Sequence, residues 1–101
     1  MDATVIGKEN CYANPNNDYW LLELEPADGK VIGDEVEVGG ILYKHVVKTK
    51  GLPNDLKKTG QHLRIGYDVL SSKRVLVNVC DVSSPVQYEV YEIPILASER
   101  L

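Results

Sequence analysis

The residues best suited to chemistry in this chain of 101 residues are two cysteines, Cys11 and Cys80. An even number of cysteines in a short chain favours one disulfide in an oxidising compartment, and two reduced thiols in a cytosolic core are the alternative. By loop-closure entropy, a bridge between them would stabilise the fold by about 4 kcal/mol. No neighbouring residues mark either thiolate as activated, so we expect the cysteines to be structural.

Metal binding and catalysis have weaker signals. His45 and His62 lie far from each other and from the cysteines, whereas structural zinc ligands come in closely spaced pairs. The serines lie in turn-like or terminal segments, and no Gly-x-Ser-x-Gly elbow is present. Asp28, Asp34 and Glu35 are spaced along a glycine-bearing stretch, a pattern typical of solvated acids. We therefore expect no metal, no cofactor and no enzymatic activity.

A third group combines aromatic and basic residues, namely Tyr43, Lys44, Lys48 and Arg64. Rings beside cations are typical of surfaces that bind single-stranded nucleic acid. The net charge of −4 has the wrong sign for binding phosphates by overall charge. However, residues 1–40 hold nine acids and two bases, while residues 41–101 hold six acids and nine bases. These four residues are therefore a candidate ligand face, with a mildly basic solvated surface as the alternative.

The elements that would position these residues are mainly strands. Period-two alternation, β-branched residues and turn chemistry predict strands at about 3–7, 19–25, 35–38, 41–49, 63–69, 75–82 and 87–96. Pro94 cannot donate to a ladder, so the last strand is expected to be bulged or at an edge. One helix of one or two turns is predicted over 53–59, because proline opens the segment and Gly60 follows it.

This order of elements predicts a single all-β domain over 1–101, a five- or six-stranded OB-like barrel with one short helix before the fourth main strand. Closing the sheet would remove the exposed edges of so small a domain. An immunoglobulin-like sandwich is the competing architecture, and the helical insert weighs against it. Residues 26–40 form an acidic, glycine-bearing stretch that is either an interaction loop or a tolerated insertion.

Three segments resemble small exported lipoprotein domains of Bacteroidetes. They are residues 4–7 followed by Cys11 and residues 19–24, the "LP-x-x-apolar-K-x-x-G" turn and following strand over 51–65, and Cys80 with the strand over 88–93. The resemblance covers most of the chain outside 26–40. It implies an OB-like fold, a Cys11–Cys80 bridge, and export with a lipid anchor upstream. It implies no assigned activity.

The opening residues have neither the basic nor the long apolar region of a signal peptide. This leaves two alternatives, a cytosolic protein or an exported one whose export segment has been removed. Our leading hypothesis is an exported, lipid-anchored module of the periplasm or cell surface that binds a protein or glycan without catalysis. The rival hypothesis is a cytosolic OB module that binds single-stranded nucleic acid through Tyr43, Lys44, Lys48 and Arg64.

Overall fold

The protein is all-β. The computed structural model describes residues 1–26, 32–67, 73–74 and 79–101. Its strands are, in chain order, β1 (Asp2–Lys8), β2 (Trp20–Leu24), β3 (Asp34–Val38), β4 (Ile41–Thr49), β5 (His62–Tyr67), β6 (Lys73–Arg74), β7 (Tyr91–Glu92) and β8 (Ile95–Arg100). The helical elements among these residues are two 3-10 turns, η1 (Pro15–Asn17) and η2 (Asn54–Leu56).

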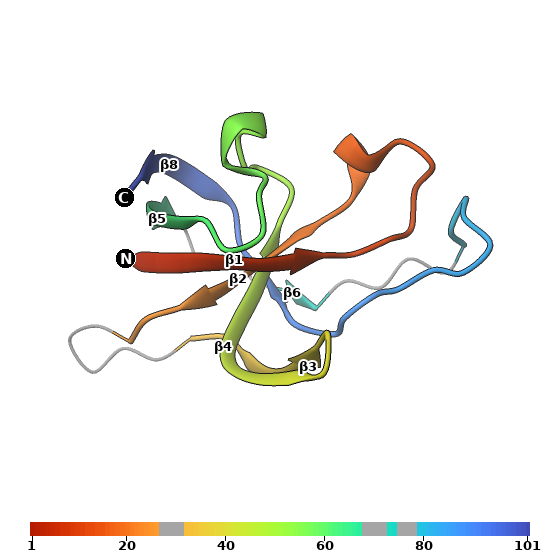
Figure 1. The fold of residues 1–101 in the computed structure, drawn as a ribbon, viewed down its shortest axis with the longest axis horizontal. Helices are drawn as coiled ribbons and strands as arrows, with labels where there is room; N and C mark the ends of the chain where they lie inside the picture. Colours follow the sequence, from red (N-terminus) through yellow and green to blue (C-terminus); the bar gives the residue numbers. More distant parts are fainter. Residues whose placement is uncertain (27–31, 68–72, 75–78) are drawn as a thin grey trace.

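All eight strands belong to one sheet. Figure 1 shows β5, β8 and both ends of the chain on the same side of the molecule. Its order is β6-β7-β4-β2-β1-β5-β8, and β3 pairs with β4 off this path. Neighbouring strands run antiparallel except for β4 and β7, which are parallel. In the described part of the chain, β6 and β8 are not hydrogen-bonded to each other. The sheet is therefore not closed by its ladder.

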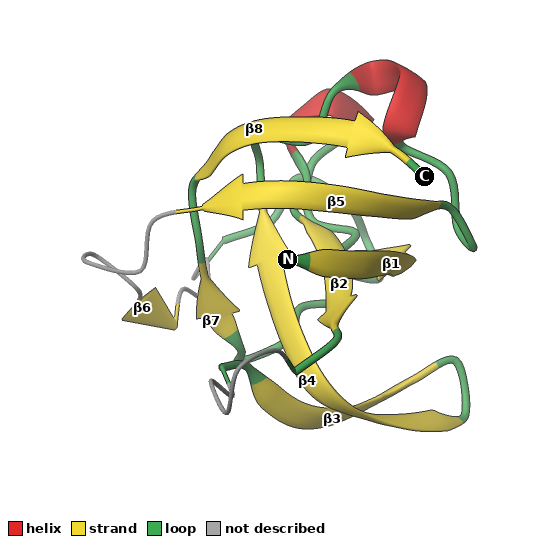
Figure 2. Cartoon of the chain, turned by 90° about the vertical axis from the view of Figure 1, so that its left-hand side faces the viewer, coloured by secondary structure: helices red, strands yellow, loops and turns green. Residues whose placement is uncertain are grey.

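The last two strands are consecutive pieces of chain that have different partners. β7 pairs with β4, and β8 pairs with β5 on the opposite side of the sheet order. Between them, Ile93 donates its N–H to Lys48 O at 3.0 Å, and Pro94 has no N–H to donate. Figure 2 shows the chain rising through β7 and turning into β8. The predicted interruption at Pro94 is therefore the place where the chain changes partner.

Both faces of the central strands are buried, because adjacent residues within these strands are apolar. Alternate residues of a strand point to opposite faces, so Leu21 and Leu22 of β2, both fully buried, lie on different sides. Leu22 and Val47 belong to the larger core cluster, together with Leu52 and Leu56 from the region of η2. The second cluster lies on the other face and contains Leu21, Val38, Val46 and Val90.

The β3–β4 hairpin supplies part of that second cluster and extends beyond it. Gly39 and Gly40 have φ of +61° and +84°, the backbone that a two-residue type I′ turn requires at both central positions. Val38 is buried, whereas Ile41 and Leu42, just after the turn, are 57% and 58% exposed. Beside this turn, Val38 of β3 therefore packs into the second cluster, while Ile41 and Leu42 of β4 lie in solvent. Figure 2 shows the β3–β4 hairpin extending away from β5 and β8.

Most elements lie where the sequence predicts them, and residues 68–69 of the strand expected over 63–69 lie outside the described residues. Three other predicted elements differ as follows. The helix expected over 53–59 is only the single 3-10 turn Asn54–Leu56, since Lys57 already leaves helical geometry with ψ of 71°. In the strand expected over 75–82, residues 75–78 lie outside the described residues, and 79–82 are not in a strand. The strand expected over 87–96 is divided into β7 and β8.

Candidate functional site

The two cysteines form a disulfide, as the sequence predicts. The Cys11 and Cys80 sulfurs are 2.16 Å apart, and their Cα atoms are 4.7 Å apart. Cys11 is buried in the loop between β1 and β2, and Cys80 is half-buried in the chain that leads to β7. A disulfide is compatible with an exported protein, because such bridges persist in oxidising compartments.

Residues 79–90, which we call the strap, are held against the β1–β2 loop by more than the sulfur bridge. Asn10 and Val86 exchange two backbone hydrogen bonds of 2.9 and 2.8 Å. Asp81 N donates to Cys11 O at 2.8 Å, and Gln87 Nε2 donates to Cys80 Sγ at 3.4 Å. The strap therefore takes its position from the loop, although it contains no strand itself.

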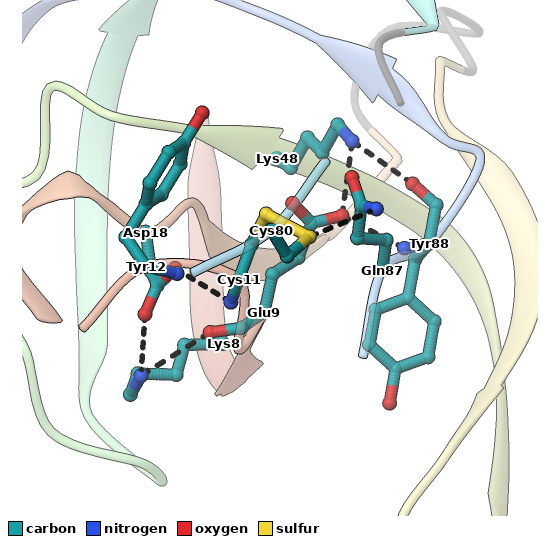
Figure 3. Close-up of a disulfide and its surroundings, with 9 residues drawn as sticks. All are labelled: Lys8, Glu9, Cys11, Tyr12, Asp18, Lys48, Cys80, Gln87 and Tyr88. Carbon is teal, nitrogen blue, oxygen red and sulfur yellow. Dashed lines mark hydrogen bonds and ion pairs between the residues drawn. A yellow bond between two sulfur atoms is a disulfide. The ribbon is translucent and has the colours of Figure 1, made fainter. Parts of the chain in front are cut away.

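A buried ion pair lies beneath the strap (Figure 3). Lys48 of β4 is fully buried and Glu9 is 2% exposed, and Lys48 Nζ lies 3.0 Å from Glu9 Oε2. The same carboxylate oxygen accepts the Tyr88 N–H at 2.7 Å, while Lys48 Nζ donates to Tyr88 O at 3.0 Å. Each charge has both a counter-ion and a hydrogen bond, and these interactions offset the free-energy cost of removing the pair from water.

A second buried carboxylate fixes the loop from within. Asp18 Oδ1 accepts the N–H groups of Cys11 and Tyr12 at 2.9 and 3.0 Å, and Asp18 Oδ2 lies 3.1 Å from Lys8 Nζ. Burial alone would raise the pKa of Asp18. The two backbone hydrogen bonds and the Lys8 ammonium outweigh it, so the pKa lies below its ordinary value. Asp18 is therefore a buried carboxylate whose hydrogen bonds hold the backbone of Cys11, one of the two disulfide cysteines.

A partly exposed group of aromatic and charged residues lies at the end of β4. Lys50 Nζ is 4.9 Å from the centre of the Tyr19 ring and 5.5 Å from that of Tyr12, distances typical of cation–π contacts. Tyr19 Oη donates to Glu92 Oε2 at 2.8 Å. Burial, that hydrogen bond and the nearby Glu92 and Glu9 charges raise the pKa of Tyr19 well above its ordinary value.

This group borders a pocket of about 380 Å³. Its lining residues are contiguous pieces of two segments, Thr49, Lys50, Gly51, Glu92, Ile93, Pro94 and Ile95. The volume lies at the lower end of the range found for small-molecule sites, about 300–1,000 Å³. The lining joins one cationic and one anionic side chain to an apolar wall of Pro94 and Ile95.

The structure does not bring the candidate ligand face together on one surface. Lys48 is buried under the strap, so its ammonium is not available to an external ligand. Tyr43 packs against the second core cluster, and Lys44 is exposed. Arg64 lies on β5, where its Nε is 3.0 Å from Asp2 Oδ1 and its Nη1 is 3.7 Å from Glu99 Oε1.

The histidines and the acidic stretch are placed separately. Among the described residues, no group of three or more histidine, cysteine or acidic side chains could hold a metal ion. His62 Nδ1 lies 3.0 Å from Thr4 Oγ1 at the surface. In the stretch 26–40, residues 27–31 lie outside the described residues, and the predicted short strand is β3. Asp34 Oδ2 accepts the Tyr91 N–H at 2.9 Å, which ties β3 to β7.

Sequence reasoning missed Glu9, Asp18, Tyr19 and Glu92. Glu9 and Asp18 flank Cys11 in a polar turn, where acids are ordinarily solvated, and their partners lie across the fold. The one local signal was the pair of lysines, Lys48 and Lys50, which alternate on a strand and therefore share a face.

The fold and its bridge define the class as an all-β domain with a disulfide linking the β1–β2 loop to the strap. Comparison with known proteins finds no matching family model, no matching curated protein and no matching solved structure. None of the described helical segments is long and apolar enough to cross a membrane.

Proposed function

We propose that this chain is an exported, OB-like β-barrel domain that serves the cell envelope as a non-catalytic binding or accessory module for a protein or glycan. The proposal includes the upstream lipid anchor that the lipoprotein resemblance implies. The observation that carries it is the Cys11–Cys80 bridge, which fastens the strap over one face of the sheet.

Support for the OB-like architecture comes from the change of partner at the chain's end. An OB barrel closes when its last strand contacts both the third and the fourth strands. Here β7 pairs with β4 in parallel and β8 pairs with β5, so one segment, interrupted at Pro94, reaches both sides of the sheet order. The turn η2 lies between β4 and β5, where the barrel's helix is expected, and Leu56 fits into the core beneath.

Support for a partner other than nucleic acid comes from the face that the strap covers. OB folds bind oligonucleotides on the face of strands 2 and 3 and on the loops beside it. In the proposed correspondence those strands are β2 and β4, and the cation that would serve there is Lys48. Its charge is already balanced by Glu9 and covered by Tyr88. A phosphate backbone would gain nothing from an ammonium that it cannot reach.

Support for a non-catalytic role comes from how the buried ionisable groups are used. Glu9 is bound by Lys48 and Tyr88, Asp18 by two backbone N–H groups and Lys8, and Tyr19 by Glu92. A general base needs an acceptor that is open to substrate, and a nucleophile needs a base beside it. These groups stabilise one another instead.

Titration of thiols in protein isolated from its native host, under denaturing and non-reducing conditions, tests export. We expect no reactive thiols, because the bridge would be formed before isolation. Two reactive thiols would overturn the exported assignment. In parallel, a labelled single-stranded oligonucleotide is titrated at low salt, where phosphate contacts are strongest. We expect no binding, and salt-dependent binding that Lys44→Met and Arg64→Gln weaken would establish the rival function.

A further inference from the structure

The pocket at the end of β4 is lined by residues of opposite charge, which favours some classes of ligand over others. It brings Lys50 and Glu92 to one concave site of about 380 Å³. Within the described chain, the contacts of Lys50 Nζ are with aromatic rings. The Glu92 side chain accepts a hydrogen bond there through Oε2 alone, from the Tyr19 hydroxyl. The ammonium hydrogens and Glu92 Oε1 are therefore available as donors and as an acceptor at the pocket.

The balance of charge favours a neutral ligand. An anionic ligand attracted by Lys50 would meet the Glu92 carboxylate, and a cationic one would meet Lys50. Juxtaposed like charges are unfavourable at a binding site. A ligand with adjacent hydroxyl groups avoids both conflicts, because a hydroxyl donates to a carboxylate and accepts from an ammonium.

The Tyr19 hydroxyl keeps the carboxylate in place. Since its pKa is raised, Tyr19 stays protonated through the physiological range and holds Glu92 Oε2 as a donor. The lining also includes apolar residues that follow Glu92 in the chain. Pro94 is exposed and Ile95 half-buried, and both residues line the pocket. A flat C–H face could pack there while hydroxyl groups reach the charged pair.

We propose that this pocket binds a neutral sugar ring, with vicinal hydroxyls bridging Lys50 Nζ and Glu92 Oε1 and the ring's C–H face against Pro94 and Ile95. This inference rests on the proposed binding function and narrows its ligand to a neutral glycan. It places the ligand at the end of β4, beside the Tyr19 ring.

The test is a titration of the oxidised, full-length chain followed by amide chemical shifts. The neutral probes are cellobiose, maltose, N,N′-diacetylchitobiose and mannobiose, and the charged probes are anionic glucuronate, cationic glucosamine and zwitterionic glycine. We expect at least one neutral disaccharide to shift the amides of Gly51, Ile93 and Ile95, with a Kd of about 1 mM or tighter. The charged probes should bind more weakly at the same amides.

Three variants make the test specific. Glu92→Gln keeps an acceptor for Tyr19 but removes the charge, and Lys50→Met keeps the aliphatic stem over the rings. Each should weaken sugar binding about tenfold or more, the effect of losing a hydrogen bond to a charged group. Lys44→Met, an equal substitution at an exposed site of β4 outside the pocket, should leave the Kd unchanged. Thermal unfolding of each variant shows that the fold is retained.

Several outcomes would overturn the inference. They are no shift at the pocket amides with any neutral probe, tighter binding of glucuronate, glucosamine or glycine, or sugar binding that neither pocket variant weakens. These failures are separable from failure of the proposed function. An oxidised protein without a sugar response overturns the glycan site alone, whereas reactive thiols in native protein overturn export and leave the pocket result standing.

Discussion

Replacing Lys48 by Met should strongly destabilise the fold, although the sequence places this lysine on a strand rich in exposed cations. At the 3.0 Å separation of Lys48 Nζ and Glu9 Oε2 and an effective dielectric constant near 20, the gross Coulomb attraction is about 5.5 kcal/mol. Much of it offsets the cost of removing both charges from water. The substitution leaves the Glu9 charge buried without its counter-ion, a loss of about 3–5 kcal/mol.

Urea unfolding followed by tryptophan fluorescence measures this loss, with two companion variants. Lys44→Met makes the same change at an exposed site of β4 and should alter the free energy of unfolding by less than about 0.5 kcal/mol. Glu9→Gln combined with Lys48→Met removes both charges and keeps an acceptor for the Tyr88 N–H, so it should recover at least half of the loss. A Lys48→Met variant as stable as Lys44→Met would refute the buried pair.

Three further perturbations address other parts of the site. Cys11→Ser with Cys80→Ser opens a loop with a sequence separation of 69 and should lower the unfolding free energy by about 4 kcal/mol in urea titrations; an unchanged midpoint would contradict this. Asp18→Asn should cost about 1–3 kcal/mol at neutral pH. Because the folded pKa of Asp18 is lowered, its contribution is complete above the unfolded pKa near 3.9 and is lost as the pH falls through the folded pKa. The difference between variant and wild type should therefore shrink in acid, and a constant difference would show that the charge is irrelevant. Gly33→Ala should lower the thermal midpoint by several degrees, since φ is +104° and the new Cβ would lie 2.6 Å from His45 C; an unaltered midpoint would contradict that close approach.

Local patterns were sufficient for β1 to β5 and insufficient for the later strands and for the face that the strap covers. The alternation on β5 and the apolar run of β2 predict their strands, because side-chain periodicity is a property of neighbouring residues. The burial of Lys48 depends on Glu9, 39 residues away, and on Tyr88, 40 residues away. A strand carrying several lysines predicts exposure unless a distant segment supplies the counter-charge, and nothing in the local sequence shows that the strap does so.

The pairing of the last two strands is a second feature that local sequence could not predict. Pro94 predicts an interruption, because it has no N–H for a ladder. It does not predict that the residues before it pair with β4 and those after it with β5, which depends on the positions of both strands. The pocket arises at this change of partner, where Ile93 and Ile95 turn toward the end of β4. Its charged residues, Lys50 and Glu92, are therefore brought together by topology rather than by spacing.

The disulfide and the burial of Lys48 are parts of one arrangement. Three consecutive residues hold the strap by different means: Glu9 through its carboxylate, Asn10 through its backbone and Cys11 through its sulfur. The strap has no strand of its own, and the hydrogen bonds of Asp81 and Tyr88 and the packing of Val90 add to these contacts. Tyr88 O accepts a hydrogen bond from the Lys48 ammonium, which also contacts Glu9 and the Tyr19 ring. The redox state of the cysteines therefore bears on the exposure of Lys48, one of the four residues of the nucleic-acid alternative, and the oligonucleotide titration must be made on the oxidised chain.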